Sequence, residues 1–272
     1  MNSVKVTINN KEVVVPSGTT IMDAAKVIGI DIPRLCFLKN INETSACRVC
    51  VVEIEGIKTL KNSCTVQVTD GMVVRTNTKR VHDAVKQTLE LLAANHRFEC
   101  WNCPREHNCE FLELLRRYNV SNYLVENPYH KKRQYITNVS DALVIDSSKC
   151  LLCGRCVSTC AKMTGLGILN YNERGFDTYV STALNHKLED AGCIYCGKCI
   201  QACPVGALKE NSQIEEVREL LNDDSVYKVV QVAPAVRVAL GEEFGYKIGT
   251  NVEGKLYRAL KELGFDDIVD TN

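Results

Sequence analysis

The sequence predicts a multidomain α+β protein, and three observations support this fold class. Val4, Val6 and Ile8 alternate with polar side chains, Asn9-Asn10 suggests a turn, and the apolar residues resume at Val13–Val15, which is the pattern of a β-hairpin. From Lys79 onward the apolar spacing becomes helical. Residues 226–272 then predict a strand, a helix and a second strand, which together form the opening of a β-α-β unit.

Further elements follow from local signals in the N-terminal part. Thr20, three residues before an aspartate, predicts the start of a short helix. Residues 51–54 have the composition of a strand. Asp70-Gly71, placed between two valine-containing runs, predicts a second hairpin. Hairpin, helix and further strands are consistent with a compact α+β domain.

The helical part of the pattern begins after this domain. Apolar residues at helical spacing predict one helix from Lys79 to His96 and another from about Cys109. Residues 119–148 are polar, and we interpret them as a connection. Ser212, with Glu215 three residues later, predicts the cap of a further helix that runs to about Leu221.

Charge and cysteine content narrow the function classes. The 272 residues include 33 basic and 33 acidic side chains, so nothing favours nucleic acid or an anionic membrane surface as a partner. No segment has the pattern of a signal peptide or a membrane span, and we expect a cytoplasmic location. The sequence has fifteen cysteines, although disulfides are rare in the cytoplasm. Because this number is odd, a complete set of disulfides would also leave one thiol unpaired. Metal ligation is therefore the expected use.

The strongest motif is an internal repeat. Residues 150–160 and 193–203 share the spacing C-x2-C-x2-C-x3-C, which is typical of ferredoxins with two 4Fe–4S clusters. In that pattern the fourth cysteine of each copy ligates the other cluster. Zinc is the less favoured alternative, because its sites use C-x2-C pairs with long spacers. The predicted ligand sets are Cys150, Cys153, Cys156 and Cys203 for one cluster, and Cys160, Cys193, Cys196 and Cys199 for the other.

A second cysteine group lies in the N-terminal domain. Cys36, Cys47, Cys50 and Cys64 are spaced over one long loop and a returning strand, an arrangement that favours a 2Fe–2S cluster. The first gap is longer than in plant-type ferredoxins. A structural zinc remains the alternative, since four thiolates suit either metal.

The third group combines a histidine with three cysteines, namely His96, Cys100, Cys103 and Cys109. His96 is spaced to supply the fourth ligand of a 4Fe–4S cluster, and His107 is the rival. A neutral imidazole in place of a thiolate removes one negative charge, which should raise the reduction potential of this site.

Together the four groups use all fifteen cysteines and His96. They predict one 2Fe–2S and three 4Fe–4S clusters, or about fourteen irons per chain. No cysteine remains for nucleophilic catalysis, and no nucleotide-binding or hydrolase motif occurs. We therefore predict an electron relay without catalytic residues of its own. The basic run at residues 130–133 is typical of a solvated loop, with a docking patch for an acidic electron carrier as the alternative.

With these four groups in this order, the chain resembles the N-terminal half of an FeFe hydrogenase. The large iron–sulfur subunit of respiratory NADH dehydrogenase and the α subunit of NAD-linked formate dehydrogenases share the cluster order. Residues 232–245 and 263–272 separate these families, because they resemble the start of the hydrogenase catalytic domain.

The resemblance implies four domains. They are a β-grasp 2Fe–2S ferredoxin domain (1–78), a small helical His/Cys3 4Fe–4S domain (79–125), a two-cluster ferredoxin-like domain (126–211) and the incomplete beginning of an α/β catalytic domain (212–272). The implied function is electron transfer between an external carrier and a catalytic H-cluster that reversibly oxidises hydrogen under anaerobic conditions. Ferredoxin or NADH-dehydrogenase-like subunits are the implied partners.

The family builds its H-cluster from later motifs, including a Thr-Ser-Cys-Cys-Pro segment, which does not occur in this sequence. We therefore expect electron transfer alone from these residues, and a longer parent chain that carries the H-cluster. The alternative is a complete, non-catalytic relay subunit of another oxidoreductase of the formate dehydrogenase or NADH dehydrogenase type.

Overall fold

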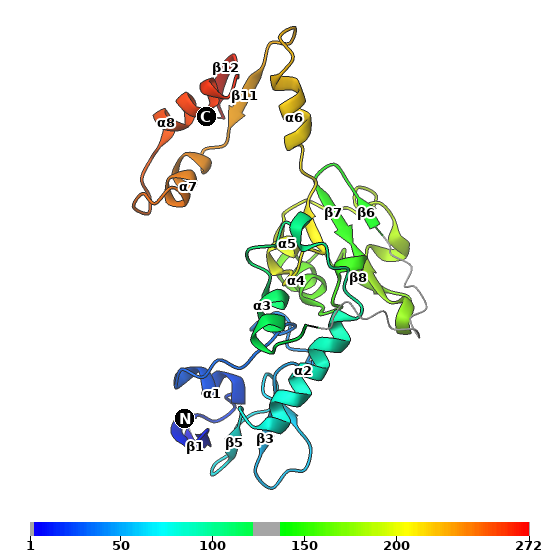
Figure 1. The fold of residues 1–272 in the computed structure, drawn as a ribbon, viewed down its shortest axis with the longest axis vertical. Coiled ribbons are helices and arrows are strands. Elements are labelled where there is room, and N and C mark those ends of the chain that lie inside the picture. The colour runs from blue at the N-terminus through cyan, green and yellow to red at the C-terminus, as the bar shows by residue number, and fades with distance from the viewer. Residues whose placement is uncertain (1–2, 122–136, 272) are drawn as a thin grey trace. The chain divides into compact units, whose positions relative to one another are not determined.

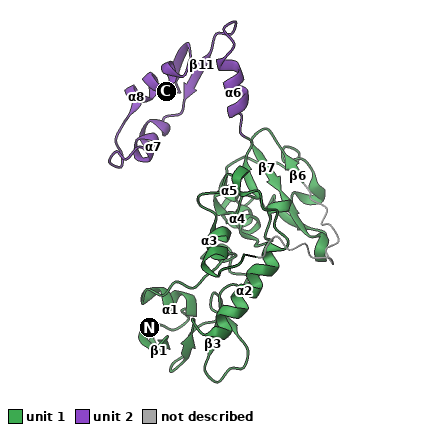
Figure 2. Ribbon diagram, viewed as in Figure 1, with its two compact units in different colours: residues 1–211 green, residues 212–272 purple. Residues whose placement is uncertain are grey.

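The computed structural model describes residues 3–121 and 137–271 (Figure 1). The chain divides into two compact units, Met1–Asn211 and Ser212–Asn272 (Figure 2). Helices and strands occur in both units, so the predicted mixture of α and β structure is confirmed.

A five-stranded sheet with the order β2-β1-β5-β3-β4 begins the first unit. β1 and β2 form the predicted hairpin, in which Asn9 and Asn10 turn the chain with φ angles of 47° and 66°. Positive φ at both central residues is what a two-residue hairpin turn requires. β5 pairs parallel with β1 and antiparallel with β3. The bounds are Ser3–Ile8 (β1), Lys11–Pro16 (β2), Val51–Ile54 (β3), Lys61–Asn62 (β4) and Val73–Arg75 (β5).

Helix α1 (Ile21–Val27) packs its apolar residues into the same core as this sheet. Thr20 caps the helix as predicted, because its side-chain oxygen accepts a hydrogen bond from the Asp23 amide at 3.1 Å. The helix fixes one end of the loop that carries Cys36 and Cys47 of the N-terminal cysteine group.

The predicted hairpin around Asp70-Gly71 is wrong. Residues 66–68 form backbone hydrogen bonds with residues 19–21, while β5 inserts between β1 and β3. Val74 in this central strand is fully buried. Insertion satisfies the backbone groups of three strands at once, whereas a local hairpin would leave the facing edges of β1 and β3 unpaired.

Two helices form the middle of the first unit, and both were predicted. α2 (Lys79–Ala93) begins after Thr78, which accepts a hydrogen bond from Val81, and it buries one apolar face. α2 ends three residues before His96. α3 (Glu110–Arg117) begins after Cys109, whose Sγ accepts a hydrogen bond from the Leu112 amide at 3.4 Å.

The repeat folds around two short helices, α4 (Arg155–Thr164) and α5 (Lys198–Ala202), each preceded by a glycine in the left-handed conformation. Beside them lies a three-stranded sheet of order β10-β7-β6. The interpretation of residues 119–148 as a polar connection is therefore wrong for β6 and β7; β7 is buried and pairs with β10. The bounds are Thr137–Val139 (β6), Leu143–Asp146 (β7), Asn170–Asn172 (β8), Tyr179–Ser181 (β9) and Leu208–Glu210 (β10).

The second unit contains the predicted β-α-β pattern, with β11 and β12 parallel. A helix that was not predicted, α7, lies between β11 and α8. Ser212 is not the cap of α6; it lies one residue before the N-cap Gln213, and its hydroxyl accepts a hydrogen bond from Ile214. The bounds are Ile214–Leu221 (α6), Val229–Val232 (β11), Val236–Glu243 (α7), Glu253–Glu262 (α8) and Asp267–Asp270 (β12).

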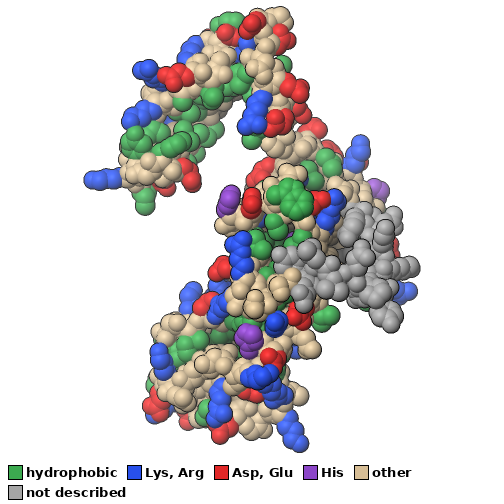
Figure 3. All heavy atoms as spheres, in the orientation of Figure 1, with side chains coloured by type: hydrophobic (Ala, Val, Ile, Leu, Met, Phe, Trp, Pro, Cys, Tyr) green, Lys and Arg blue, Asp and Glu red, His purple; other side chains and the backbone are tan. Residues whose placement is uncertain are grey.

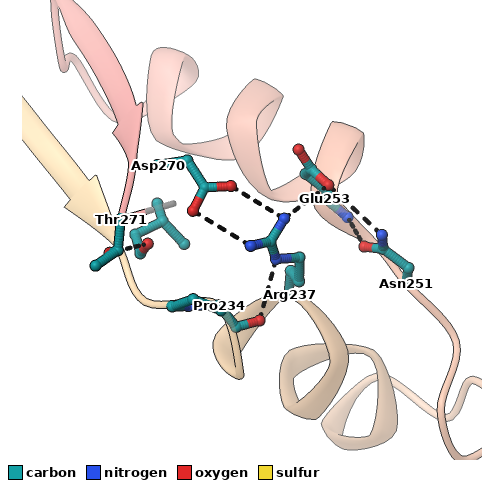
Figure 4. A network of polar contacts seen from close by, with 7 residues as sticks. Pro234, Arg237, Asn251, Glu253, Asp270 and Thr271 are labelled. Carbon is teal, nitrogen blue, oxygen red and sulfur yellow. Dashed lines mark hydrogen bonds and ion pairs between the residues drawn. The ribbon is translucent and has the colours of Figure 1, made fainter.

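Arg237 joins the elements of the second unit (Figure 4). Its guanidinium forms ion pairs with Glu253 of α8 at 3.2 Å and with Asp270 of β12 at 3.0 Å. Its Nε donates to the carbonyl oxygen of Pro234 at 3.1 Å. This largely buried cation thus holds α7, α8 and β12 together.

Acidic and basic side chains are interspersed over the face drawn in Figure 3, as expected from the balanced charge. Within the described residues, no helix has both the length and the apolar content needed to cross a bilayer.

Candidate iron–sulfur sites

All fifteen cysteines lie within the described residues, and none of them forms a disulfide there. Within residues 3–121 and 137–271, no three His, Cys, Asp or Glu side chains converge closely enough to hold a single metal ion. The side chains of the predicted groups are nevertheless brought into common neighbourhoods.

The proposed 2Fe–2S group in the N-terminal domain consists of two close pairs of cysteines. Cys50 and Cys64 have their Sγ atoms 3.3 Å apart, and the Cys36 amide donates to Cys47 Sγ at 3.4 Å. The hydrogen bond from its partner lowers the pKa of Cys47 to about 6, and the same effect lowers the pKa of Cys64 to about 6. The pKa values of Cys36 and Cys50 are raised, because each thiol donates its proton within the pair and is desolvated by burial.

Within each pair, one cysteine therefore has a lowered pKa and its partner a raised pKa. Two serine hydroxyls lie beside these pairs: the Ser63 hydroxyl donates to the Cys50 carbonyl at 2.8 Å, and Ser45 Oγ lies 3.4 Å from Cys64 Sγ. Thiolate is the form that ligates iron and zinc. Cys36 and Cys47 lie in one loop, and Cys50 directly precedes β3. Cys64, expected on a returning strand, lies in the turn after β4.

The third group surrounds a cavity whose lining includes His96, Cys100, Cys103 and Cys109. His96 is half-buried, and its Nδ1 is a buried nitrogen without a hydrogen-bond partner. Burial lowers the pKa of the imidazole to about 4, so the ring is neutral at physiological pH and can act as a metal ligand. His107, the rival, is exposed and is not among the residues that line this cavity.

The aromatic rings of Phe98 and Phe111 pack edge-on against His96, with centroid distances of 4.8 and 5.4 Å. Gly206 also lines the cavity, and its backbone approaches Cys103 so closely that a Cβ would lie 2.4 Å from the Cys103 Sγ. Lys149 also lines the cavity and is almost fully buried. These neighbours hold the histidine and one cysteine in fixed orientations.

In the repeat, a cysteine of the second copy lies near cysteines of the first copy. Burial raises the pKa of Cys156 well above the ordinary value, and nearby Cys150, Cys203, Cys153 and Cys199 raise it further, in that order. Burial likewise raises the pKa of Cys153, and Cys203 and Cys150 raise it further. Cys203 belongs to the second copy of the motif, so it crosses over to the cysteines of the first copy.

The reciprocal crossing occurs at the other site. Cys160, Cys193, Cys196 and Cys199 line one apolar cavity together with Leu169 and Leu188. The pKa of Cys199 is raised to about 12, first by burial and then by the charges of Cys193, Cys196 and Cys160. A backbone amide also points at this set, because Ile168 donates to Cys160 Sγ at 3.3 Å.

These donor sets fit iron–sulfur clusters. Cysteine thiolates and histidine imidazoles are ligands that such clusters use. The buried Nδ1 of His96 has no hydrogen-bond partner. At Gly206, the absence of a side chain leaves space for the sulfur of Cys103. Amide donors to sulfur, as at Cys160, are among the factors that set cluster potentials.

Three residues around these sites have no signal in the sequence: Asn42, Arg155 and Gly206. Each acts through contacts with residues distant in the sequence. For example, the segment Cys-Pro-Val-Gly, which ends at Gly206, gives no indication that the sulfur of Cys103 lies close to this glycine. The basic run at residues 130–133 lies outside the described residues.

Four family models match successive parts of the chain. They describe a 2Fe-2S iron-sulfur cluster binding domain (residues 1–79), an NADH-ubiquinone oxidoreductase-G iron-sulfur binding region (86–123), the ferredoxin-like domain of NADH-quinone oxidoreductase subunit 3 (140–209) and the C-terminal domain of the iron only hydrogenase large subunit (226–272). The chain therefore contains 2Fe–2S and 4Fe–4S binding domains.

Individual relatives extend this result. The NADP-reducing hydrogenase subunit HndD of Solidesulfovibrio fructosivorans is 42% identical over 100% of this chain, and Iron hydrogenase 1 of Clostridium pasteurianum is 40% identical over 93%. The chain spans about half of their lengths, 47% and 44%. An NADH-quinone oxidoreductase subunit of Rhizobium meliloti is 35% identical over 75% of this chain, and the match covers 24% of that protein.

A crystal structure of an NAD+-reducing [NiFe]-hydrogenase in the H2-reduced state contains a chain that matches with a TM-score of 0.69 and 25% identity, over 78% of this chain and 88% of that one. The hydrogenase relatives match into the C-terminal part of this chain, where the hydrogenase family model also matches. The chain is thus an iron–sulfur protein that is similar, over about half of their lengths, to the two hydrogenases named above.

Proposed function

We propose that the chain carries electrons through four clusters, one 2Fe–2S and three 4Fe–4S. When bound, these clusters accept and release electrons. The chain supplies the ligands and excludes water from them. The proposed sets are Cys36, Cys47, Cys50 and Cys64 (2Fe–2S); His96, Cys100, Cys103 and Cys109 (4Fe–4S); Cys150, Cys153, Cys156 and Cys203 (4Fe–4S); and Cys160, Cys193, Cys196 and Cys199 (4Fe–4S).

The observation that carries this proposal is the reciprocal crossing in the repeat. Cys203 lies with the first copy and Cys160 with the second, an exchange that two separate C-x2-C zinc sites would not need. At the third group, the buried and neutral imidazole of His96 supports its choice over the exposed His107.

The proposal includes four domains with boundaries at residues 1–78, 79–125, 126–211 and 212–272. For the first of them, the mixed sheet in which β5 lies parallel to β1, together with α1, supports a β-grasp fold. For the last, the parallel strands β11 and β12 support the opening of an α/β domain.

As the electron-carrying half of an FeFe hydrogenase, the chain would connect an H-cluster in the parent protein with ferredoxin or with NADH-linked partner subunits. Two relatives carry hydrogenase names, and residues 226–272 match the hydrogenase C-terminal model. A cytoplasmic, anaerobic setting belongs to the same proposal. The second candidate is a free-standing relay subunit, which the match to the NADH-quinone oxidoreductase of Rhizobium meliloti supports.

Two experiments test these statements. Cys203→Ser should weaken the cluster of the first repeat copy, and Cys160→Ser that of the second copy, as resolved by electron paramagnetic resonance of the reduced chain. Loss of the same-copy cluster in each variant would contradict the crossed ligand sets. The mass of the native polypeptide separates the candidates: a mass well above 30.3 kDa supports the hydrogenase, and a matching mass supports the relay subunit.

A further inference from the structure

Asn42 lies at a junction between two candidate sites that are far apart in the sequence. Its side chain is buried, and its Nδ2 donates to the carbonyl oxygens of both Cys36, at 2.8 Å, and Cys153, at 3.0 Å. Cys36 belongs to the proposed 2Fe–2S group, and Cys153 to a proposed 4Fe–4S group. One carboxamide thus ties together two ligand loops that come from different domains.

The hydrogen-bonding capacity of this carboxamide is used on both sides. Its two N–H groups reach the two cysteine carbonyls, and its Oδ1 accepts a hydrogen bond from the Ser158 hydroxyl at 2.7 Å. A carboxylate in the same place would have no proton to donate to either carbonyl, and an apolar side chain would leave both carbonyls without this donor. This position therefore requires the hydrogen-bonding groups of a carboxamide, and a side chain of similar size without them would not replace it.

The backbone around Asn42 is itself fixed. Leu38 and Asn42 exchange two backbone hydrogen bonds, of 2.9 and 2.7 Å, across a tight turn in which Asn40 has a φ of 64°. On the other side, Gly154 has a φ of 79°, and a Cβ there would lie 2.5 Å from Tyr171 Oη and 3.6 Å from Asn42 Oδ1. Both loops therefore lie in contact with Asn42.

We propose that Asn42 is a positioning residue for electron transfer between the 2Fe–2S site and the 4Fe–4S site of Cys150, Cys153, Cys156 and Cys203. This inference rests on the proposed function. In the transfer one electron leaves the reduced site and enters the oxidised one, no bond forms or breaks, and no proton moves. Asn42 holds the two ligand loops at a fixed separation, on which the transfer rate and the magnetic interaction between the reduced sites depend.

The test compares two buried asparagines in the full-length, cluster-loaded chain. Asn42→Leu removes the tie. Asn138→Leu is the matched control, because Asn138 is also buried and its side chain donates to Ser181 and to the His186 carbonyl, neither of which is a candidate ligand. The readouts are iron content, midpoint potentials and the spin–spin interaction in electron paramagnetic resonance spectra of the reduced chain.

We expect Asn42→Leu to retain its iron and to lose the interaction between the two sites, and we expect Asn138→Leu to keep it. An unchanged interaction in iron-loaded Asn42→Leu overturns the proposal. If Asn42→Leu does not hold iron, Ser158→Ala decides: this milder change removes one contact of Asn42 Oδ1 and should weaken the interaction. An unweakened interaction in iron-loaded Ser158→Ala then overturns the proposal.

The failure of the proposed function has a different signature. Wild-type chain that binds no iron after anaerobic loading contradicts the iron–sulfur assignment itself. If the wild-type chain binds iron and the interaction between its two sites is unchanged in Asn42→Leu and Ser158→Ala, the proposed relay stands and only the role of Asn42 is refuted.

Discussion

Gly206→Ala should remove one cluster while leaving the other three. Gly206 is buried, and its neighbours Val205 and Ala207 are each 1% exposed. A Cβ at this position would lie 2.4 Å from Cys103 Sγ, about 1 Å short of the 3.4 Å at which ordinary contact begins. Either the backbone or the sulfur must move.

The backbone is the harder of the two to move. Ala207 accepts a hydrogen bond from the Asp146 amide at 2.8 Å, which ties this segment to β7. Inserting a methyl group into such a packed site typically costs about 1–3 kcal/mol. Displacement of Cys103, a proposed ligand, relieves the clash, so the site that contains His96 is the one expected to fail.

The assay is iron content per chain together with the spectrum of the reduced protein. Iron should fall from about fourteen to about ten, with loss of the His96-site signal, since a 4Fe–4S cluster carries four irons. Gly254→Ala is the control, because its Cβ would meet nothing within 4 Å and it lies in α8. A Gly206→Ala chain with full iron and an unchanged His96-site signal would refute this reasoning.

Three further predictions follow from the same sites. His96→Cys should keep the iron but shift one centre to lower potential in a redox titration, because a thiolate adds negative charge; His107→Ala should change neither, and loss of a cluster there would reverse the ligand assignment. Arg155→Met should lower the free energy of unfolding by about 1.5–3 kcal/mol, since Arg155 is buried and bonds both carboxylate oxygens of Glu110 at 2.6 and 2.9 Å; an unchanged urea midpoint would contradict this. Burial raises the pKa of the Cys153 thiol from 9.0 to about 12, so the metal-free chain should lose stability as the pH rises above 9.0. A flat dependence of the urea midpoint on pH in the metal-free chain would count against that burial.

The sequence predicted the regular elements that depend on local signals. The first hairpin follows from its alternation and from asparagines that tolerate positive φ, and the start of α1 follows from the Thr20 cap. The pairing around Asp70-Gly71 was missed because β5 is placed by two distant strands, which no local pattern encodes. β7 was missed for a similar reason, since its partner β10 lies some sixty residues away along the chain.

The sequence was enough to group the candidate ligands, but it was not enough to identify the residues that surround them. Cluster geometry dictates the spacing of cysteines along the chain, so spacing alone groups them. The spacing already favoured His96 over His107, and the place of His96 in the cavity lining, together with the exposure of His107, supports that choice. Asn42 and Gly206 were not predicted, since their importance arises from contacts with Cys153 and Cys103 across the fold.

The most direct test of the central claim is the iron, sulfide and zinc content of the full chain after anaerobic preparation. Four clusters in the proposed sets predict about fourteen irons per chain, with matching acid-labile sulfide and without stoichiometric zinc. Stoichiometric zinc with little iron or sulfide would contradict the relay and would turn the same cysteines into structural metal sites.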